Sequence, residues 1–419
     1  MLEGSNKTPM MPNYSSRFLR EAAAECTQAG AMLGAGAALK VCYTLDRGGG
    51  EVSNGQNCFM RQYDLIEYLA MAMQAGASDV HLSPGAPPVM RLHGRMTPVT
   101  DEVLTAQDVR ELILGGLKDT QRSKLEQEWE LDFAIEVENL GRFRGNACFC
   151  MGRVEGNFRY IPDVIPELSQ LGHGPTVEKF CDLRDGLVLI TGVSNSGKTT
   201  TLCSMTQQIA ASRSCNIVTI EDPVEFVFKH GQSLIRQRQV GFDTHEFARA
   251  MKSALRQDVN VITVSELRDL ETIRTALTAA ETGHLVIATL HTTDVPATIT
   301  RILDSYPKDQ QEYVAAQLSH CLRGVICQHL IRRADGEGRV MASEVMIVNN
   351  AIAASIRDQR IQQLPSLIQI GGRDGMHTID DSLLHLLSYG FITLEDAKAH
   401  CRDFSFIKMG LEKLQREQR

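Results

Sequence analysis

Several features are scarce or missing in this sequence of 419 residues, and each absence excludes a class of protein. No apolar run reaches the roughly 18 residues that a membrane-spanning helix needs. The first thirty residues lack the basic, apolar and small-residue pattern of a signal peptide. The eleven cysteines form no C-x-x-C pair, which argues against a disulfide framework and against a four-cysteine zinc site. We therefore expect a cytoplasmic chain without direct membrane insertion.

Basic residues are fewer than acidic ones, and aromatic residues are also scarce. The chain carries 43 Lys and Arg against 51 Asp and Glu, a net charge of -8, and 5% of its residues are aromatic. Basic runs interleaved with aromatic residues, which are typical of proteins that bind single-stranded nucleic acid, are missing. We expect no nucleic-acid partner. The 43% of apolar and 22% of charged residues are typical of a folded globular protein.

Changes in sequence texture predict the domain boundaries. Residues 1–60 contain glycine-rich stretches and one Ala-rich segment over 18–39, and we interpret them as a variable, mobile extension, with a gene-start artefact as the alternative. Apolar residues at helical spacing begin at Tyr63 and strand-like segments follow, which predicts a smaller α+β domain over 61–165. A linker is expected over 166–185.

Apolar strands alternate with helical segments over 186–345, which predicts an α/β domain with a parallel sheet and helices on both faces. A helical C-terminal subdomain is expected over 346–419. The expected strands are 79–82, 89–92, 133–137, 142–144 and 157–161 in the first domain and 187–191, 217–221, 261–264 and 285–290 in the second. The expected helices are 105–128, 245–256, 269–280, 310–330, 351–361, 380–387 and 394–400.

The strongest motif matches the phosphate-binding pattern G-x-x-x-x-G-K-[ST] and lies between an expected strand and an expected helix. Backbone N–H groups at the start of a helix bind phosphate oxygens, the lysine reaches the β- and γ-phosphates, and the hydroxyl that follows ligates Mg²⁺. The alternative is a glycine-rich turn that happens to end in lysine. The predicted nucleotide-binding residues are Gly192, Val193, Ser194, Asn195, Ser196, Gly197, Lys198, Thr199 and Thr200.

Acidic residues and histidines lie at the ends of the next three expected strands. Because the carboxyl ends of parallel strands share one edge of a sheet, where ligands bind, residues there should face the same crevice. One carboxylate suits a metal, another can orient an attacking water, and a histidine can sense phosphate. A solvated acidic loop and a structural histidine are the alternatives. The residues are Glu221, Asp222 and Glu225, then Glu266, then His284 and His291.

In this order and spacing, the motifs resemble those of the secretion and pilus motor ATPases, the type II/type IV secretion ATPase family, and most of all its twitching-motility pilus retraction type. The resemblance runs from about Tyr63 to about His400 and includes the specific stretches 269–274 and 276–285. It implies a PAS-like N-terminal domain, a RecA-like P-loop ATPase domain and a helical C-terminal subdomain.

The resemblance also implies roles for single residues. Arginines of the N-terminal domain would reach the nucleotide at the domain cleft or across a subunit boundary, although strand-edge arginines are often only solvated. Carried over by position, Lys198 and Thr199 match the Walker A motif, and Glu225 matches the general base of the Asp box. Glu266 matches the Walker B acid, and Thr199 and Glu266 match the metal ligands. The His box is matched by His284 and His291, and the arginine segments by Arg142, Arg144 and Arg159.

The implied cofactors are ATP and Mg²⁺, and the implied assembly is a homo-hexamer. Its implied partners are an inner-membrane pilus platform protein and possible sister motor ATPases, which would place the chain in the cytoplasm, peripheral to the inner membrane. Extension and type II secretion ATPases usually carry a further N-terminal domain and a four-cysteine insertion, and we expect neither in this protein. The stretch 351–357 resembles the retraction motif AIRNLIR, with Ala353 where that motif has Arg.

Three positions depart from the family pattern. Asn195 and Ser265 stand where the family has Gly, and Val259-Asn260 stands where Pro-Asp is usual. Asn tolerates positive φ, so we expect the loop to be preserved, whereas Ser265 would displace the Walker B acid if its backbone needed a glycine-only conformation. We predict a working retraction ATPase. The alternatives are a weakly active ring subunit that partners another pilus motor, or a type IV secretion or DNA-uptake motor on the same fold.

Overall fold

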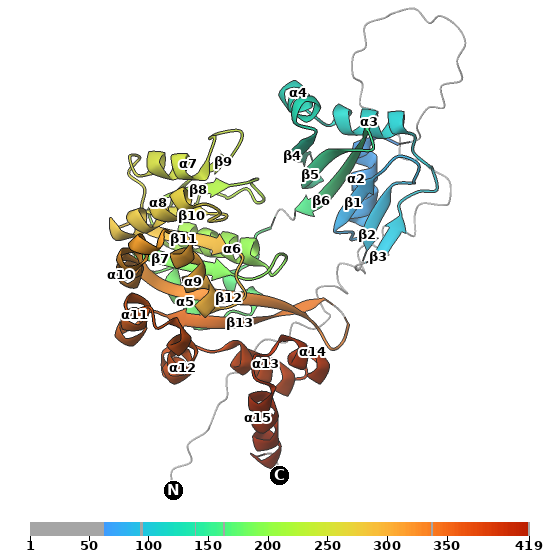
Figure 1. Cartoon of the computed structure of the whole chain (residues 1–419). Coiled ribbons are helices and arrows are strands. Elements are labelled where there is room, and N and C mark those ends of the chain that lie inside the picture. The colour runs from blue at the N-terminus through green and yellow to red at the C-terminus, as the bar shows by residue number, and fades with distance from the viewer. Residues whose placement is uncertain (1–62, 93–94, 139, 162–163, 337, 418–419) are drawn as a thin grey trace, which may run out of the picture. The chain divides into compact units, whose positions relative to one another are not determined.

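The computed structural model describes residues 63–92, 95–138, 140–161, 164–336 and 338–417. The predicted extension over 1–60 and its Ala-rich segment lie outside these ranges. Two β-sheets organise the described residues, one of six strands and one of seven, and a group of helices follows the second sheet (Figure 1). The predicted α/β architecture with a helical C-terminal region is therefore present.

The six-stranded sheet is antiparallel throughout, with the order β3-β2-β1-β6-β5-β4. Its inward side chains pack with the helices in one apolar core, where the rings of Phe133 and Phe158 meet edge to face at 6.0 Å. The strands are β1 Asp79–Leu82, β2 Val89–Leu92, β3 Arg95–Pro98, β4 Glu130–Val137, β5 Gly141–Cys150 and β6 Arg153–Ile161. The helices are α2 Leu65–Gln74, α3 Ala106–Gly115 and α4 Asp119–Glu128.

The single helix predicted over 105–128 is wrong, because the chain forms two helices there. Thr105 and Asp108 make a reciprocal capping box that starts α3. Gly116 then caps its C-terminus, at a position where a Cβ atom would lie 2.9 Å from the Leu65 side chain. Helix α3 therefore ends at Gly115, and α4 begins at Asp119.

The seven-stranded sheet has the order β13-β12-β7-β11-β10-β8-β9, and only β13 runs antiparallel to its neighbour. The strands are β7 Gly186–Thr191, β8 Asn216–Glu221, β9 Leu234–Gln239, β10 Val261–Val264, β11 Leu285–Leu290, β12 Leu322–Arg332 and β13 Arg339–Ile347. The helices are η1 Leu168–Leu171, α5 Pro175–Phe180, α6 Lys198–Ser212, α7 Phe247–Ala254, α8 Leu270–Glu281, α9 Val295–Asp304, η2 Lys308–Gln310 and α10 Gln311–Cys321.

The centre of this sheet is covered on both faces. Every residue of β7 and β11 is buried, as expected for parallel strands between two helical layers. Leu187 and Leu189 pack into one apolar cluster, whereas Val188 and Ile190 pack into another on the opposite face. Because β7, β11, β10 and β8 run parallel, their carboxyl ends lie at the same edge of the sheet.

The helix predicted over 310–330 is wrong in its second half. Helix α10 ends at Cys321, and the chain continues as β12, which pairs with β7 and β13. Residues 324–328 are all buried, and a Cβ atom at Gly324 would lie 2.2 Å from the ring of Phe180. A fully buried strand shows no polar alternation, so its periodicity resembles that of a buried helix.

Helices and short 3-10 turns complete the chain (Figure 1). Three of them, α13 to α15, share an apolar cluster with Ile331 of β12 and Ala342 of β13, so these helices rest on the β12–β13 hairpin. The elements are α11 Asn350–Arg357, η3 Ile361–Gln363, α12 Leu364–Ile370, η4 Gly371–Asp374, α13 Ile379–Ser388, α14 Leu394–His400 and α15 Phe404–Glu417.

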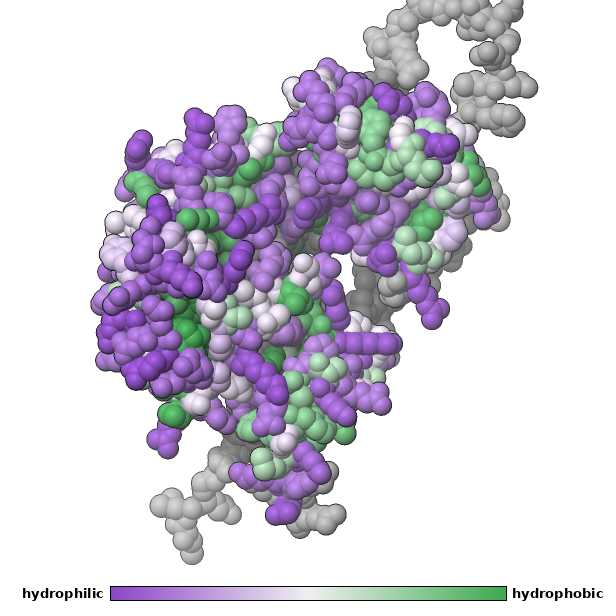
Figure 2. All heavy atoms as spheres, viewed as in Figure 1, coloured by the Kyte–Doolittle hydropathy of each residue, from purple (hydrophilic) through white to green (hydrophobic). Residues whose placement is uncertain are grey.

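The face of the molecule in Figure 2 is mostly hydrophilic, with apolar patches of limited extent. In the part of the chain that the structure describes, no helix is both long and apolar enough to cross a bilayer.

Candidate nucleotide-binding site

The loop between β7 and α6 carries the predicted phosphate-binding motif. Its backbone takes positive φ angles at Gly192 (143°), Asn195 (63°) and Gly197 (88°). A Cβ atom at Gly192 would lie 2.4 Å from the Gln328 carbonyl oxygen and 2.5 Å from Ser196 Oγ, so glycine is needed there. Gly197 is the N-cap of α6, so the first N–H groups of that helix belong to the loop, as in an anion-binding helix terminus.

A chain of polar contacts joins the lysine of this loop to the end of β10. Lys198 Nζ donates to the carbonyl oxygens of Gly192 and Val193 at 2.9 and 2.8 Å and lies 3.3 Å from His291 Nδ1. His291 Nε2 lies 3.3 Å from Glu266 Oε1. Because the ammonium only donates and the carboxylate only accepts, these contacts select the imidazole with its proton on Nε2. Burial lowers the pKa of Lys198, and the charge of Glu266 opposes that shift.

The backbone before Glu266 is held by both neighbouring strands. Ser265 N donates to the Ile220 carbonyl oxygen at 2.9 Å, and the Ser265 carbonyl oxygen accepts from Thr289 Oγ1 at 2.5 Å. Arg268 Nε donates to Glu266 Oε2 at 2.8 Å. The backbone before Glu266 is thus held by β8 and β11, and its carboxylate is oriented by Arg268 of the following loop.

Glu221 is the last residue of β8, Asp222 follows it, and each has partners of its own. Glu221 is buried and accepts from Thr219 Oγ1 at 2.6 Å and from Gln237 Nε2 at 3.0 Å. Burial raises its pKa, and these two hydrogen bonds oppose the shift. Asp222 pairs with Arg268 at 3.1 Å. These contacts brace the acidic loop against the rest of the site.

Glu225 lies in the same loop and its side chain is 26% exposed. Burial raises its pKa, whereas the charges of Arg144 and Arg159 and a hydrogen bond with Thr199 lower it. Arg144 Nη1 lies 3.5 Å from Glu225 Oε1. A half-buried carboxylate with a raised pKa beside the phosphate-binding loop has the environment of a general base.

The three predicted arginines lie on one face of the six-stranded sheet. Arg142 and Arg144 are two residues apart on β5, and Arg159 of β6 pairs with Arg144 across the sheet. Arg159 also pairs with Asp79 at 2.8 Å. Arg142 Nε is buried and has no hydrogen-bond partner within the described part of the chain.

A cavity of about 510 Å³ brings most of the predicted residues together. Arg142 and His284 are not among the residues that line it, and Gly192 and Val193 take part through their carbonyl contacts with Lys198. The predicted residues that line the cavity are Arg144, Arg159, Ser194, Asn195, Ser196, Gly197, Lys198, Thr199, Thr200, Glu221, Asp222, Glu225, Glu266 and His291.

His284 lies at the opposite edge of the sheet from His291. It precedes β11, and its Nδ1 lies 3.1 Å from the Ala279 carbonyl oxygen and 3.4 Å from Thr282 Oγ1. These contacts close the turn between α8 and β11. Two histidines that bracket one buried strand face opposite edges, which explains why only one of them reaches the cavity.

A family model described as "Type II/IV secretion system protein" matches residues 61–369. The chain belongs to this family. The "Type IV pilus retractation ATPase PilT" of Pseudomonas aeruginosa is 44% identical over 336 residues, 80% of this chain and 97% of that protein. The "Type IV pilus ATPase PilU" of the same organism is 35% identical over 348 residues, 82% of this chain and 91% of that protein. The crystal structure of the pilus retraction motor PilT with bound ADP matches with a TM-score of 0.76 and 42% identity, over 82% of this chain and 98% of that one.

These matches confirm the predicted family, fold class and ATPase class. The structure also explains the departures from the family pattern. Asn195 takes a φ of 63°, a conformation in which Asn often replaces Gly, and Ser265 is not among the described non-glycine residues with positive φ. Val259 is buried in the core beside β10. The backbone therefore accommodates Asn195 at a positive φ and does not require glycine at Ser265.

Two residues that sequence reasoning missed also line the cavity. Arg268 lies two residues after Glu266 and contacts it. A basic residue just after an acidic strand end could therefore have been predicted to belong to the site. Arg339 starts β13, and its Nη1 lies 3.4 Å from the Asn195 carbonyl oxygen. No local pattern marks Arg339, because it reaches the loop only through the pairing of β12 with β7 and β13.

The residues present fit a nucleoside triphosphate with Mg²⁺. The buried Ser196 Oγ has no partner within the described part of the chain and lies in the same loop as the glycine cradle. The Thr199 hydroxyl and the Glu266 carboxylate are hard oxygen ligands of the kind that Mg²⁺ prefers. Among the residues described, no group of three or more His, Cys, Asp or Glu side chains could hold a metal, so phosphate oxygens would have to complete this one.

Proposed function

We propose that this chain hydrolyses ATP with Mg²⁺ as a homo-hexameric motor that powers type IV pilus retraction, the movement that drives twitching motility. The observation that carries the proposal is the contact chain from Lys198 through His291 to Glu266, at the mouth of a phosphate-binding loop. The family membership and the similarity to pilus retraction ATPases support it.

The loop and its flanking residues would bind the nucleotide. The backbone N–H groups from Ser194 to Thr200 suit the phosphate oxygens, and Lys198 would exchange its two carbonyl contacts for the β- and γ-phosphates. Arg144 and Arg159 of the six-stranded sheet would offset charge that develops on the γ-phosphate, and Arg142 would reach nucleotide only from a neighbouring subunit.

Thr199 and Glu266 would hold the metal. When bound, Mg²⁺ would supply positive charge that offsets the negative charge developing during transfer. Glu266 keeps its orientation through Arg268 and through the strand contacts of Ser265. Glu221 and Asp222 brace the neighbouring acidic loop.

Glu225 would orient and deprotonate the attacking water. Its raised pKa favours proton uptake, and the nearby arginine charges keep the carboxylate ionised. His291, with its proton on Nε2, would sense the γ-phosphate while it contacts both Lys198 and Glu266. The segments that follow β8, β10 and β11 would therefore supply the base, the metal ligand and the sensor from one edge of the sheet.

As a hexamer, the motor would work in the cytoplasm, peripheral to the inner membrane. It would act on an inner-membrane pilus platform protein, and a sister motor ATPase such as one of the PilU type would be a possible partner in the same system. We expect no nucleic-acid partner.

The test is ATP turnover by the purified full chain with Mg²⁺, together with sizing of the assembly. Lys198→Ala and Glu266→Gln should each lower kcat about 10³-fold, because each removes a charge that acts on the transferring phosphoryl group. Lys308→Ala, a change of an exposed lysine in η2, is the matched control and should leave turnover unchanged. A Lys198→Ala protein with the parent's turnover, or a lack of rings in solution, would contradict the proposal.

A further inference from the structure

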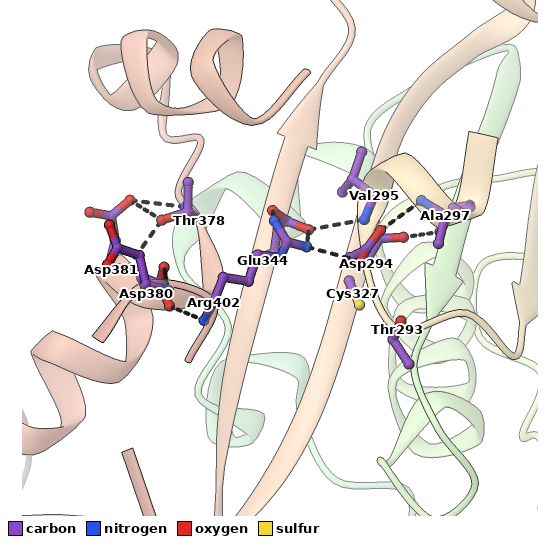
Figure 3. Close-up of polar contacts among 12 residues, drawn as sticks. Thr293, Asp294, Val295, Ala297, Cys327, Glu344, Thr378, Asp380, Asp381 and Arg402 are labelled. Atoms are coloured by element: carbon purple, nitrogen blue, oxygen red, sulfur yellow. Dashed lines mark hydrogen bonds and ion pairs between the residues drawn. The ribbon is translucent and has the colours of Figure 1, made fainter. Parts of the chain in front are cut away.

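A buried ion pair lies outside the cavity, between the sheet and the C-terminal helices. Arg402 contacts Glu344 of β13 in a bidentate arrangement, with Nη1 to Oε1 at 2.7 Å and Nη2 to Oε2 at 2.8 Å (Figure 3). The Glu344 side chain is 1% exposed, and that of Arg402 is 33% exposed. Bidentate arginine–carboxylate pairs hold both partners in a defined orientation. Arg402 lies beyond the residues 61–369 that the family model matches.

The position of Arg402 is set by the C-terminal helices. It lies between α14 and α15, and the Asp380 carboxylate of α13 accepts from the backbone N–H of Arg402 at 2.8 Å and from that of Asp403 at 3.0 Å. These helices share an apolar cluster with β12 and β13. The guanidinium group is therefore anchored to a packed unit rather than to a loose tail.

The other side of the ion pair holds the start of α9. Glu344 Oε2 accepts from the backbone N–H of Val295, the first residue of α9, at 2.9 Å. Asp294 caps the helix by accepting from Ala297 N at 2.6 Å, and its carboxylate lies 3.7 Å from Arg402 Nη2. Figure 3 shows these groups in one row from Asp380 to Ala297.

The first residue of α9, Val295, lies four residues after His291. Thr298 of α9 holds the connecting segment in place. Its Oγ1 lies 2.7 Å from Thr292 Oγ1 of that segment and 3.5 Å from Thr191 Oγ1, at the end of β7. His329 Nε2 lies 3.2 Å from the Thr293 carbonyl oxygen. A displacement of the α9 start would therefore move this short, tethered segment and the histidine before it.

The geometry points to Arg402 as a positioning residue for the ATPase site: together with Glu344 it fixes the α9 start and thereby the loop that presents His291 to Lys198 and Glu266. The inference rests on the proposed function, since it assigns Arg402 an effect on turnover through His291. Arg402 touches none of the cavity residues named above, so its effect on chemistry has to pass through the position of that loop.

The test is a double-mutant cycle in the full chain, with ATP turnover at saturating ATP and Mg²⁺ as the readout. Arg402→Gln should lower kcat about tenfold with KM for ATP within about twofold, because a misplaced catalytic group slows the step without removing the binding loop. Arg402→Lys keeps the charge but loses the bidentate contact, and it should recover part of the loss. Arg373→Gln, a change of an exposed arginine in η4, is the matched control and should change nothing.

The second half of the cycle repeats Arg402→Gln in a His291→Ala background. If Arg402 acts through His291, its loss should then lower kcat less than about twofold. Equal losses in both backgrounds would show a merely structural role and overturn the inference, as would an unchanged kcat in Arg402→Gln alone. A His291→Ala protein with normal turnover would overturn the proposed role of His291 itself, and the inference with it.

Arg402→Gln leaves the Glu344 carboxylate buried without its partner, so the variant can fail to fold. The double variant Glu344→Gln/Arg402→Gln removes both charges together and avoids that penalty. It should fold, retain ATP binding and show the same loss of kcat. A folded double variant with the parent's kcat would overturn the inference.

Discussion

The two ends of strand β11 differ in what their histidines contact. At the carboxyl edge, His291 lies within reach of Lys198, the first residue of α6, and of Glu266, which follows β10. At the amino edge, His284 contacts the Ala279 carbonyl oxygen and the Thr282 hydroxyl, both from the turn before it. The carboxyl edge gathers groups from distant parts of the sequence, whereas the amino edge closes a local turn. Turnover should therefore respond to changes at the first edge, and only stability to changes at the second.

The largest effect is expected from Glu225, the proposed base at the carboxyl edge. Glu225→Gln should lower kcat about 10³-fold, because an amide cannot accept the proton of the attacking water. ATP binding, measured by titration without turnover, should stay within about threefold. Glu271→Gln, which changes an exposed glutamate of α8, is the control and should leave kcat unchanged. Glu225 is not the base if its variant turns over ATP at the parent's rate.

The pH profile of turnover gives a second view of the same carboxylate. Burial raises the Glu225 pKa, so the acid limb of kcat/KM should lie above the usual range of a glutamate. Arg144 lowers that pKa, so Arg144→Gln should move the limb to higher pH. A limb that moves to lower pH would contradict the assignment.

The two histidines of β11 provide the sharpest comparison. His291→Ala should lower kcat about 10²-fold, since it removes a polar contact at the transferring phosphate and frees Lys198 and Glu266 from each other. His284→Ala should keep kcat within about twofold and lower the free energy of unfolding by about 1 kcal/mol, the typical value of one lost hydrogen bond. Turnover assays and chemical denaturation on both variants check this. Equal losses of kcat would remove the difference between the edges.

A third histidine, away from both ends of β11, should act on stability alone. His173 is buried against Thr201 of α6, and burial together with the charge of His377 lowers its pKa to about 4. The unfolded chain then binds the proton more tightly, so stability is fully present above about pH 6.5 and is lost as the pH falls toward 4.

For His173 alone, the expected loss between pH 7.5 and pH 5 is about 2 kcal/mol in the free energy of unfolding. His173→Gln keeps a hydrogen-bonding group beside Thr201 but does not titrate, so it should show a smaller loss over the same range. His377 is also buried with a lowered pKa and contributes with the same sign in both proteins. Denaturant unfolding at the two pH values measures the difference, and parallel losses in both proteins would argue against this role for His173.

The strands β7, β8, β10 and β11 of the ATPase sheet could be predicted because each is a short apolar run that ends at or just before a polar residue. The strands β9 and β12 could not be predicted in the same way. Leu234–Gln239 carries four polar residues in six, since β9 lies at the edge of the sheet. Leu322–Arg332 is so deeply buried that its pattern cannot be told from a helix. The extent of burial of a strand is decided by its neighbours, which a local pattern does not contain.

The site could be predicted where the strand ends carry it, as with Lys198, Glu225, Glu266 and His291. Sequence order placed His284 in the same motif as His291, but the pleat and the direction of β11 separate them by the whole strand. Arg339 and Arg402 escaped prediction because each acts across long sequence separations, through the β12–β13 hairpin and the helices packed on it. The domain boundaries proposed from the sequence stay a prediction.

The smallest effect is expected at Asn195, where a difference from the family glycine raised the question of a weakly active subunit. Asn195→Gly should change kcat less than about twofold, because Asn195 already takes the left-handed conformation that the loop needs. Asn195→Val should be worse, since a β-branched residue at a φ of 63° is strained by about 1–2 kcal/mol. Ser265→Gly should likewise be neutral. A tenfold or larger rise in turnover on restoring glycine at these positions would show that Asn195 and Ser265 impair the site at the carboxyl edge. That result would favour the alternative of a weakly active subunit that partners another motor.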